Sequence, residues 1–186
     1  MNHSKRHSML CPNCGRLISS HEPQCHHCGI ARPGAWWNRY LAAWTKHPRQ
    51  FVLGIIYLNA AMYVIALLMD LRFISIAPRP LSFLAPSIDA LILLGAAGTT
   101  TIRGVHGWWS LLAANYLHGG ILHIFFNMAA LWQLAPVVIR EYGSNRMMII
   151  YTLGGMLGFM LSFFVGVRLT IGASAAVCAL LGAILY

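Results

Sequence analysis

The sequence is poor in charged side chains, and above all in acidic ones. Only 9% of its 186 residues are charged, and Asp and Glu together number four. Soluble domains carry charge on roughly a quarter of their residues, so an ordinary soluble domain is excluded. The first 30 residues also lack an apolar core. We therefore expect no cleavable signal peptide at this end of the chain.

Hydrophobic residues are abundant, at 58%, and after residue 50 they form long runs. A membrane-spanning helix needs roughly 20 apolar residues. Residues 51–69, 120–139 and 147–167 meet this length, and residues 169–186 barely do. Residues 81–98 are also apolar, but a proline and an aspartate interrupt them, which favours a re-entrant or surface segment. The sequence predicts an all-α polytopic membrane protein with four spans.

Seven of the thirteen Lys and Arg residues lie within residues 1–50. In a membrane protein this excess indicates orientation rather than nucleic acid binding, and we expect no nucleic acid partner. Lys46 and Arg49 precede the first span, and Arg140 and Arg146 bracket the loop between the second and third spans. We therefore expect both regions and the N-terminus to lie in the cytoplasm. Three arginines after the first span argue against this orientation, because they would then lie outside. A bacterial inner (plasma) membrane fits the orientation.

Four of the five cysteines form two CxxC pairs separated by ten residues: Cys11, Cys14, Cys25 and Cys28. A glycine after each pair permits a tight turn, so that four thiolates can converge on one ion. This ligand set suits zinc, and so small a segment has almost no core without a metal. Substitution of one thiolate by His26 or His27 is an alternative, and so is a pair of disulfides, which a reducing cytoplasm disfavours. We predict a structural zinc ion in residues 1–32.

Residues 33–50 join this segment to the first span. Trp37, Tyr40, Leu41 and Trp44 share one side of a helix, while the basic residues lie elsewhere. The pattern is typical of an interfacial helix with aromatic rings at headgroup level. A plain linker with ordinary aromatic belt residues explains it equally well.

The second predicted span carries polar residues in NYLHGGILHIFFNM. His123 and Asn127 are four apart and share one helix face, while His118 lies at the helix mouth. Polar groups inside a membrane are usually functional or paired, and these fit a metal site, a proton relay or a polar packing seam. With the N-terminus inside, His123, Asn127 and Ser174 share the outer half of the bilayer. One cavity there could supply the nucleophile, oxyanion donors and water that a serine hydrolase needs.

Several ordered motifs resemble those of the rhomboid intramembrane serine proteases. They are GWWSLLAANYLHGGILHIFFNM, EYGSNRMM and GASAAVCALLG, which are similar to the family's Trp-Arg loop, HGGxxHxxxN helix, Glu-x-Gly-Ser loop and GxSG turn. The resemblance runs from about residue 81 to residue 186. It implies a rhomboid-like helical bundle with four of six core spans present. The expected domains are a zinc ribbon (1–32), an interfacial linker (33–50) and an incomplete membrane domain (51–186).

The resemblance also implies roles for individual residues. Ser174 would be the nucleophile, and its own N–H, His123 and Asn127 would form the oxyanion hole. His118 would support the cavity mouth, and Gly172 would let the backbone turn closely at the site. Catalysis of this kind needs no cofactor. The substrates would be membrane-embedded proteins, cut in or near transmembrane segments within the lipid bilayer.

The sequence departs from the family pattern at three positions and in length. Ala175 stands where the GxSG motif has its second glycine, Ser110 where the loop has arginine, and Cys178 where an aromatic residue is frequent. The family's general base is a histidine on the sixth span, beyond residue 186, so this fragment is expected to be inactive. The alternatives are a non-catalytic rhomboid-like protein that binds transmembrane helices, and a metal site on His118 and His123. The zinc ribbon could recruit a cytoplasmic partner, sense metal or only fold the tail.

Overall fold

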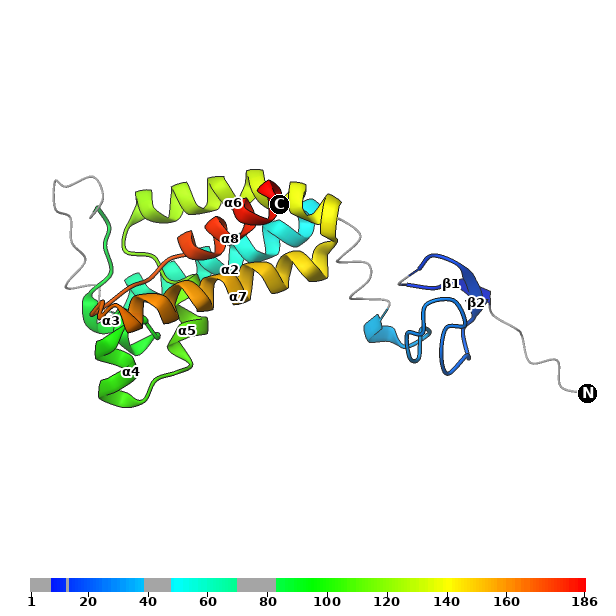
Figure 1. Ribbon diagram of the computed structural model, residues 1–186, viewed down its shortest axis with the longest axis horizontal. Helices are drawn as coiled ribbons and strands as arrows, with labels where there is room; N and C mark the ends of the chain where they lie inside the picture. The colour runs from blue at the N-terminus through cyan, green and yellow to red at the C-terminus, as the bar shows by residue number, and fades with distance from the viewer. Residues whose placement is uncertain (1–7, 13, 39–47, 70–82) are drawn as a thin grey trace, which may run out of the picture. The chain divides into compact units, whose positions relative to one another are not determined.

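The computed structural model describes residues 8–12, 14–38, 48–69 and 83–186. The chain divides into two compact units, Met1–Phe51 and Val52–Tyr186 (Figure 1). The interfacial helix expected in residues 33–50 falls mostly on residues 39–47, which lie outside the described residues. The two units are therefore described one at a time.

The first unit is a two-stranded sheet followed by cysteine-containing turns. Strand β1 (Ser8–Leu10) pairs antiparallel with β2 (Leu17–Ser19), so that Met9 lies opposite Ile18. Its buried cluster consists of Cys11, Ile18 and Cys25, with Met9 and Ile30 packed against them. So small an apolar cluster offsets little of the conformational entropy lost on folding. The unit needs a further source of stability.

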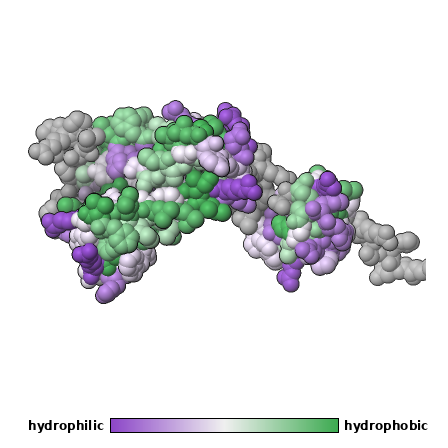
Figure 2. Space-filling view, in the orientation of Figure 1, coloured by the Kyte–Doolittle hydropathy of each residue, from purple (hydrophilic) through white to green (hydrophobic). Residues whose placement is uncertain are grey.

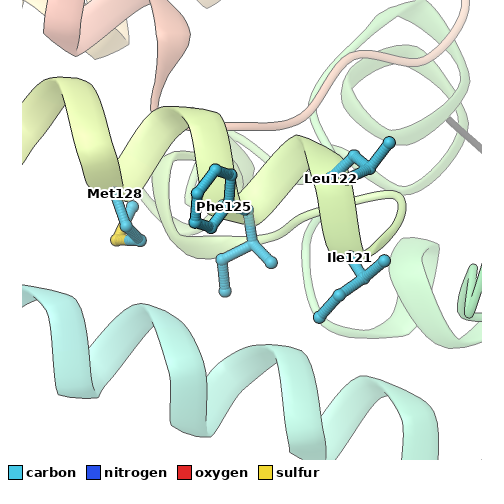
Figure 3. Close-up of a pocket in the computed structure, with 5 residues that line it drawn as sticks. Ile121, Leu122, Phe125 and Met128 are labelled. Carbon is cyan, nitrogen blue, oxygen red and sulfur yellow. The ribbon is translucent and has the colours of Figure 1, made fainter.

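Three long apolar helices frame the second unit: α2 (Pro48–Met69), α6 (Ile121–Tyr142) and α7 (Ser144–Phe164). At ~1.5 Å per residue, helices of this length cross the roughly 30 Å hydrocarbon core of a bilayer. Within the described residues, these three are long and apolar enough to do so. Figure 2 shows hydrophobic surface over much of this unit. The prediction of a helical membrane protein is confirmed.

The fourth apolar segment differs from the expected span. Helix α8 (Ser174–Leu185) has only 12 residues. The residues before it run as extended chain, because Ala97 and Thr170 exchange both backbone hydrogen bonds, at 3.0 and 2.7 Å. The Thr99 N–H also donates to the Val167 carbonyl, at 2.9 Å. The backbone groups that Val167 and Thr170 use in this pairing are not available to a continuous helix.

Helix α8 packs against α6 and α7 (Figure 1). Small residues permit the close approach to α7: Gly154 faces Ala179, and Gly158 faces Ala175. A Cβ atom added at Gly158 would lie 2.6 Å from the Cβ of Ala175. These small residues therefore form a close contact between two helices, of the kind that drives helix association in membranes.

Short helices precede α6 in the described residues from 83 onward. They are α3 (Ile88–Leu93), α4 (Thr99–Val105), α5 (Ser110–Ala113) and the 3₁₀ turn η3 (Ala114–Tyr116). Ile102 and Leu111 bury against Phe159 of α7 and hold this region on the helical frame. The segment at residues 81–98, described from residue 83 onward, contains the six-residue α3 and no helix of spanning length.

Candidate functional site

Ser174 is the first residue of α8, and its side chain is exposed. The chain reaches it through Gly172, whose φ of +116° favours glycine. The Gly172 N–H donates to the Ala114 carbonyl at 2.9 Å, and Ala173 is fully buried. This fixed turn presents the serine at a helix N-terminus. The first N–H groups of a helix have no intrahelical acceptor, so they can donate to an anion formed there.

The ring of His123, from α6, lies directly against this turn. A Cβ atom at Gly172 would lie 2.6 Å from His123 Nε2 and 2.8 Å from Cε1. The Gly119 N–H donates to His123 Nδ1 at 3.3 Å. Because Nδ1 accepts, the neutral ring carries its proton on Nε2. The histidine therefore directs an N–H donor at the turn that precedes Ser174.

Asn127 lies one helical turn beyond His123 and is nearly buried, at 8% exposure. Its Nδ2 group donates to the His123 carbonyl of the same helix at 2.8 Å. This bond holds the amide on the helix surface and uses one of its two N–H groups. The other N–H group is not engaged by that bond.

His118 lies in the loop before α6 and is fully buried. Its ring meets that of His123 edge to face, with centroids 5.1 Å apart. Neither ring nitrogen has a hydrogen-bond partner among the described residues. Burial, together with the nearby His123, lowers the pKa of His118 to about 4. The ring is therefore neutral near pH 7 and acts here as packing beneath His123.

The three residues that depart from the family pattern differ in burial and contacts. The Ala175 methyl group lies against Gly158 of α7, so the alanine fills a helix contact. Ser110 is fully buried, and its hydroxyl has no partner among the described residues. Cys178 is exposed, one turn after Ser174.

Two backbone groups that position the site could not be identified from the sequence. The Gly119 N–H sets the tautomer of His123, and the Ala114 carbonyl anchors the turn at Gly172. Both are backbone groups, and a backbone group leaves no mark on residue type. The paired glycines before His123 were the one available signal.

The four N-terminal cysteines lie in two turns with the same hydrogen bonds. The Cys11 N–H donates to the Arg16 carbonyl, and the Cys25 N–H to that of Ile30, in each case five residues on. Within each turn, the glycine four residues after the first cysteine donates back to that cysteine, at 2.9 Å both times. These glycines, Gly15 and Gly29, have φ of +71° and +76°. The two halves of the cluster therefore repeat one local structure.

The four sulfur atoms lie within 4.8 Å of one another. Cys11 and Cys28 are 3.7 Å apart at Sγ, and Cys14 and Cys25 are 3.8 Å apart. Tetrahedral zinc with bonds of about 2.3 Å to sulfur requires sulfur atoms about 3.8 Å from each other. The four cysteines could therefore hold a metal ion, and their spacing fits zinc.

The fold and the serine turn define a class, namely a helical integral membrane protein with an exposed serine beside oriented hydrogen-bond donors. Residues 105–186 match the family model of the Rhomboid domain. Residues 105–186 therefore form a domain of the rhomboid type.

The relatives that it matches include a named protease and a protein named as inactive. The chain is 40% identical over 98 residues to Rhomboid protease GluP of Bacillus subtilis (strain 168), covering 53% of this chain and 19% of that protein. It is 36% identical over 104 residues to RHOMBOID-like protein 4 of Arabidopsis thaliana, covering 55% and 26%. It is 30% identical over 114 residues to Inactive RHOMBOID-like protein 8 of the same plant, covering 61% and 32%. The chain thus spans a minor part of these curated relatives, and no solved structure matches it.

Proposed function

We propose that this chain carries the nucleophile and the oxyanion donors of a rhomboid-type intramembrane serine endopeptidase. The observation that carries the proposal is the contact between His123 and Gly172. It directs the Nε2–H of His123 at the turn that presents Ser174. A nucleophile with a preorganised donor beside it is the arrangement that acyl transfer requires.

The proposed reaction begins when Ser174 Oγ attacks the carbonyl carbon of a peptide bond in a transmembrane substrate. The serine proton passes to a general base, and the carbonyl oxygen becomes an oxyanion. The Ser174 N–H, His123 Nε2–H and the second N–H of Asn127 donate to that oxyanion. The amine leaves with the proton from the base, and water then hydrolyses the acyl-enzyme. His118 and Gly172 support this geometry without touching the substrate.

The two histidines closest to the serine turn do not suit the role of base. His118 is buried against His123. The Nδ1 atom of His123 accepts from Gly119, and its Nε2 carries the proton. We propose that the base is a histidine outside residues 1–186, as the family resemblance implies, and that residues 1–186 alone are inactive. The exposed side of α8 at Ser174 leaves room for that group.

A serine-directed fluorophosphonate tests the nucleophile in the full-length protein. We expect Ser174→Ala to abolish labelling. The matched control is Ser162→Ala, because the Ser162 hydroxyl is engaged with the Gly158 carbonyl at 3.0 Å on α7. Equal labelling of wild type and Ser174→Ala would refute the proposal.

A non-catalytic rhomboid-like protein that binds transmembrane helices is the second candidate. The Trp109-Ser110 pair and the match to an inactive relative favour it. The same labelling experiment separates the two functions. A full-length protein that captures a transmembrane helix, yet neither cleaves it nor reacts with the fluorophosphonate, is the binder.

We further propose that the N-terminal cysteines hold one structural zinc ion. The repeated turns and the 3.7–3.8 Å sulfur spacings support this proposal. The test is metal analysis of the purified protein, with one zinc per chain expected. A chain that is folded in residues 8–38 and free of metal contradicts the proposal.

We also propose domain boundaries at residues 1–32, 33–50 and 51–186. The N-terminus lies in the cytoplasm of a bacterial cell. The zinc ribbon binds a cytoplasmic partner there. Residues 1–50 hold seven basic residues, which supports this orientation. A membrane-impermeant amine reagent should label Lys5 only after the membrane is opened. Labelling of intact cells would reverse the orientation.

A further inference from the structure

The turn from α4 to α5 and the end of α7 form an exposed aromatic surface around one arginine. The Arg103 guanidinium lies 5.5 Å from the centre of the Phe163 ring. That ring meets Trp108 and Phe164 edge on, with centroids 5.7 and 5.5 Å apart. Trp108 is 52% exposed and Phe164 is 73% exposed. We name Arg103, Trp108, Phe163 and Phe164 the Arg103 surface.

The Arg103 surface lies at the end of a spanning helix. Helix α7 is apolar up to Phe164, its last residue, so the surface sits where the helix leaves the hydrocarbon core. Tryptophan and tyrosine gather at this depth in membrane proteins, with their rings among the headgroups. Arginine side chains near helix ends extend towards the same layer. The surface therefore faces lipid.

The charge of Arg103 has no acidic counterpart in the described structure. The one ion pair found among the described residues joins His26 to Glu22, in the other unit. The whole sequence offers only four acidic residues. The Phe163 ring holds the guanidinium in place through a cation–π contact, which reduces its freedom before any ligand arrives. A planar guanidinium donates two parallel N–H groups, which fits a phosphate group.

We propose that the Arg103 surface binds the phosphate of an anionic phospholipid. Arg103 pairs with the phosphate, while Trp108 and Phe164 lie against the glycerol and upper acyl region of the same lipid. A soluble phosphate would leave these exposed rings without a partner, so the ligand is the lipid. The interaction is independent of the proposed protease function.

Hydrogen exchange measured by mass spectrometry tests the proposal locally. The protein is placed in nanodiscs of phosphatidylcholine, with or without phosphatidylglycerol, and exchange is followed in peptides that cover residues 99–113. We expect phosphatidylglycerol to slow this exchange by about fivefold, which corresponds to one arginine near an anionic surface. Arg103→Gln should abolish the difference. Arg140→Gln is the matched control, because it removes the same charge from an exposed position in the last turn of α6, and it should keep the difference.

Three results would overturn the proposal: equal exchange in the two lipids, an undiminished difference in Arg103→Gln, or loss of the difference on adding soluble glycerophosphate. If Arg103→Gln lowers the thermal unfolding midpoint, Arg103→Lys replaces it. A folded Arg103→Lys that keeps part of the difference supports the proposal, and one that keeps none overturns it.

Discussion

The two units of this protein differ in what their residues can contribute to stability. The N-terminal unit has a buried cluster of three residues, two of them cysteines that face a common centre. The membrane unit contains no such centre among its described residues, and it holds together through helix contacts as close as that of Gly158 with Ala175. We therefore expect the first unit to depend on metal binding by its cysteines, and the second to depend on close helix packing. Each should therefore fail under changes that leave the other intact.

The largest expected effect is loss of the N-terminal fold in Cys25→Ser. Zinc-coupled folding contributes on the order of 10 kcal/mol in small zinc domains, far more than the apolar cluster here can replace. We expect zinc to be lost and exchange to become fast throughout residues 8–38, with exchange in α6 and α7 unchanged. Cys178→Ser is the matched control and should keep one zinc per chain, because Cys178 lies on α8. Retained zinc in Cys25→Ser would contradict this expectation.

Gly172→Ala should destabilise the membrane unit by about 3 kcal/mol. An alanine at φ of +116° is strained, and its methyl group would collide with the His123 ring. Thermal unfolding in detergent measures the effect, and zinc content should not change. Gly182→Ala, in α8 with nothing within 4 Å of the added methyl group, should be neutral or slightly stabilising. Equal unfolding midpoints for the two variants would show that the turn tolerates a side chain.

Gly154→Ala should destabilise the same unit by roughly 1–3 kcal/mol, because its methyl group would meet that of Ala179. The double variant Gly154→Ala with Ala179→Gly moves the methyl group across the interface. We expect it to recover most of the loss in a double-mutant cycle. Additive effects of the two changes would place the packing defect elsewhere.

The smallest expected effect is that of Tyr142→Phe, at about 1 kcal/mol. It removes the hydrogen bond from the Tyr142 hydroxyl to the Ala183 carbonyl, 2.9 Å long, which joins the end of α6 to the end of α8. Tyr57→Phe changes an exposed tyrosine and should leave the unfolding midpoint unchanged. A Tyr142→Phe variant as stable as wild type would show that water replaces this bond.

The parts of the fold that sequence predicts well are those with few physical alternatives. A run of some 20 apolar residues in a membrane forms a helix, because a helix satisfies all of its backbone hydrogen bonds internally. The sequence therefore predicted α2, α6 and α7. The two CxxC pairs likewise fix a thiol cluster. The start of α8 could not be predicted, because residues 169–173 are as apolar as the helix that follows. Their conformation depends on pairing with a distant segment at Ala97.

The same limit applies to the candidate site. The spacing of His123 and Asn127 predicts a shared helix face, and the motif order indicates the rhomboid family. The direction of the His123 proton depends on a backbone N–H at Gly119, which residue types do not reveal. The catalytic roles of Ser174, His123 and Asn127 stay predictions until a reagent or a substrate reports on them.

The extended pairing at Ala97 and Thr170 determines which neighbouring positions can tolerate substitution. The pairing is made by backbone atoms, so the exposed side chains of Val167 and Arg168 contribute little to it and can be exchanged, whereas Leu169 packs against the core. Glycine cannot be exchanged freely on either side of it. A methyl group at Gly98 would strike the Arg168 backbone, and one at Gly172 would strike His123. We therefore expect the paired segments to tolerate substitution at exposed positions such as Val167 and Arg168, and to reject it at Gly98 and Gly172.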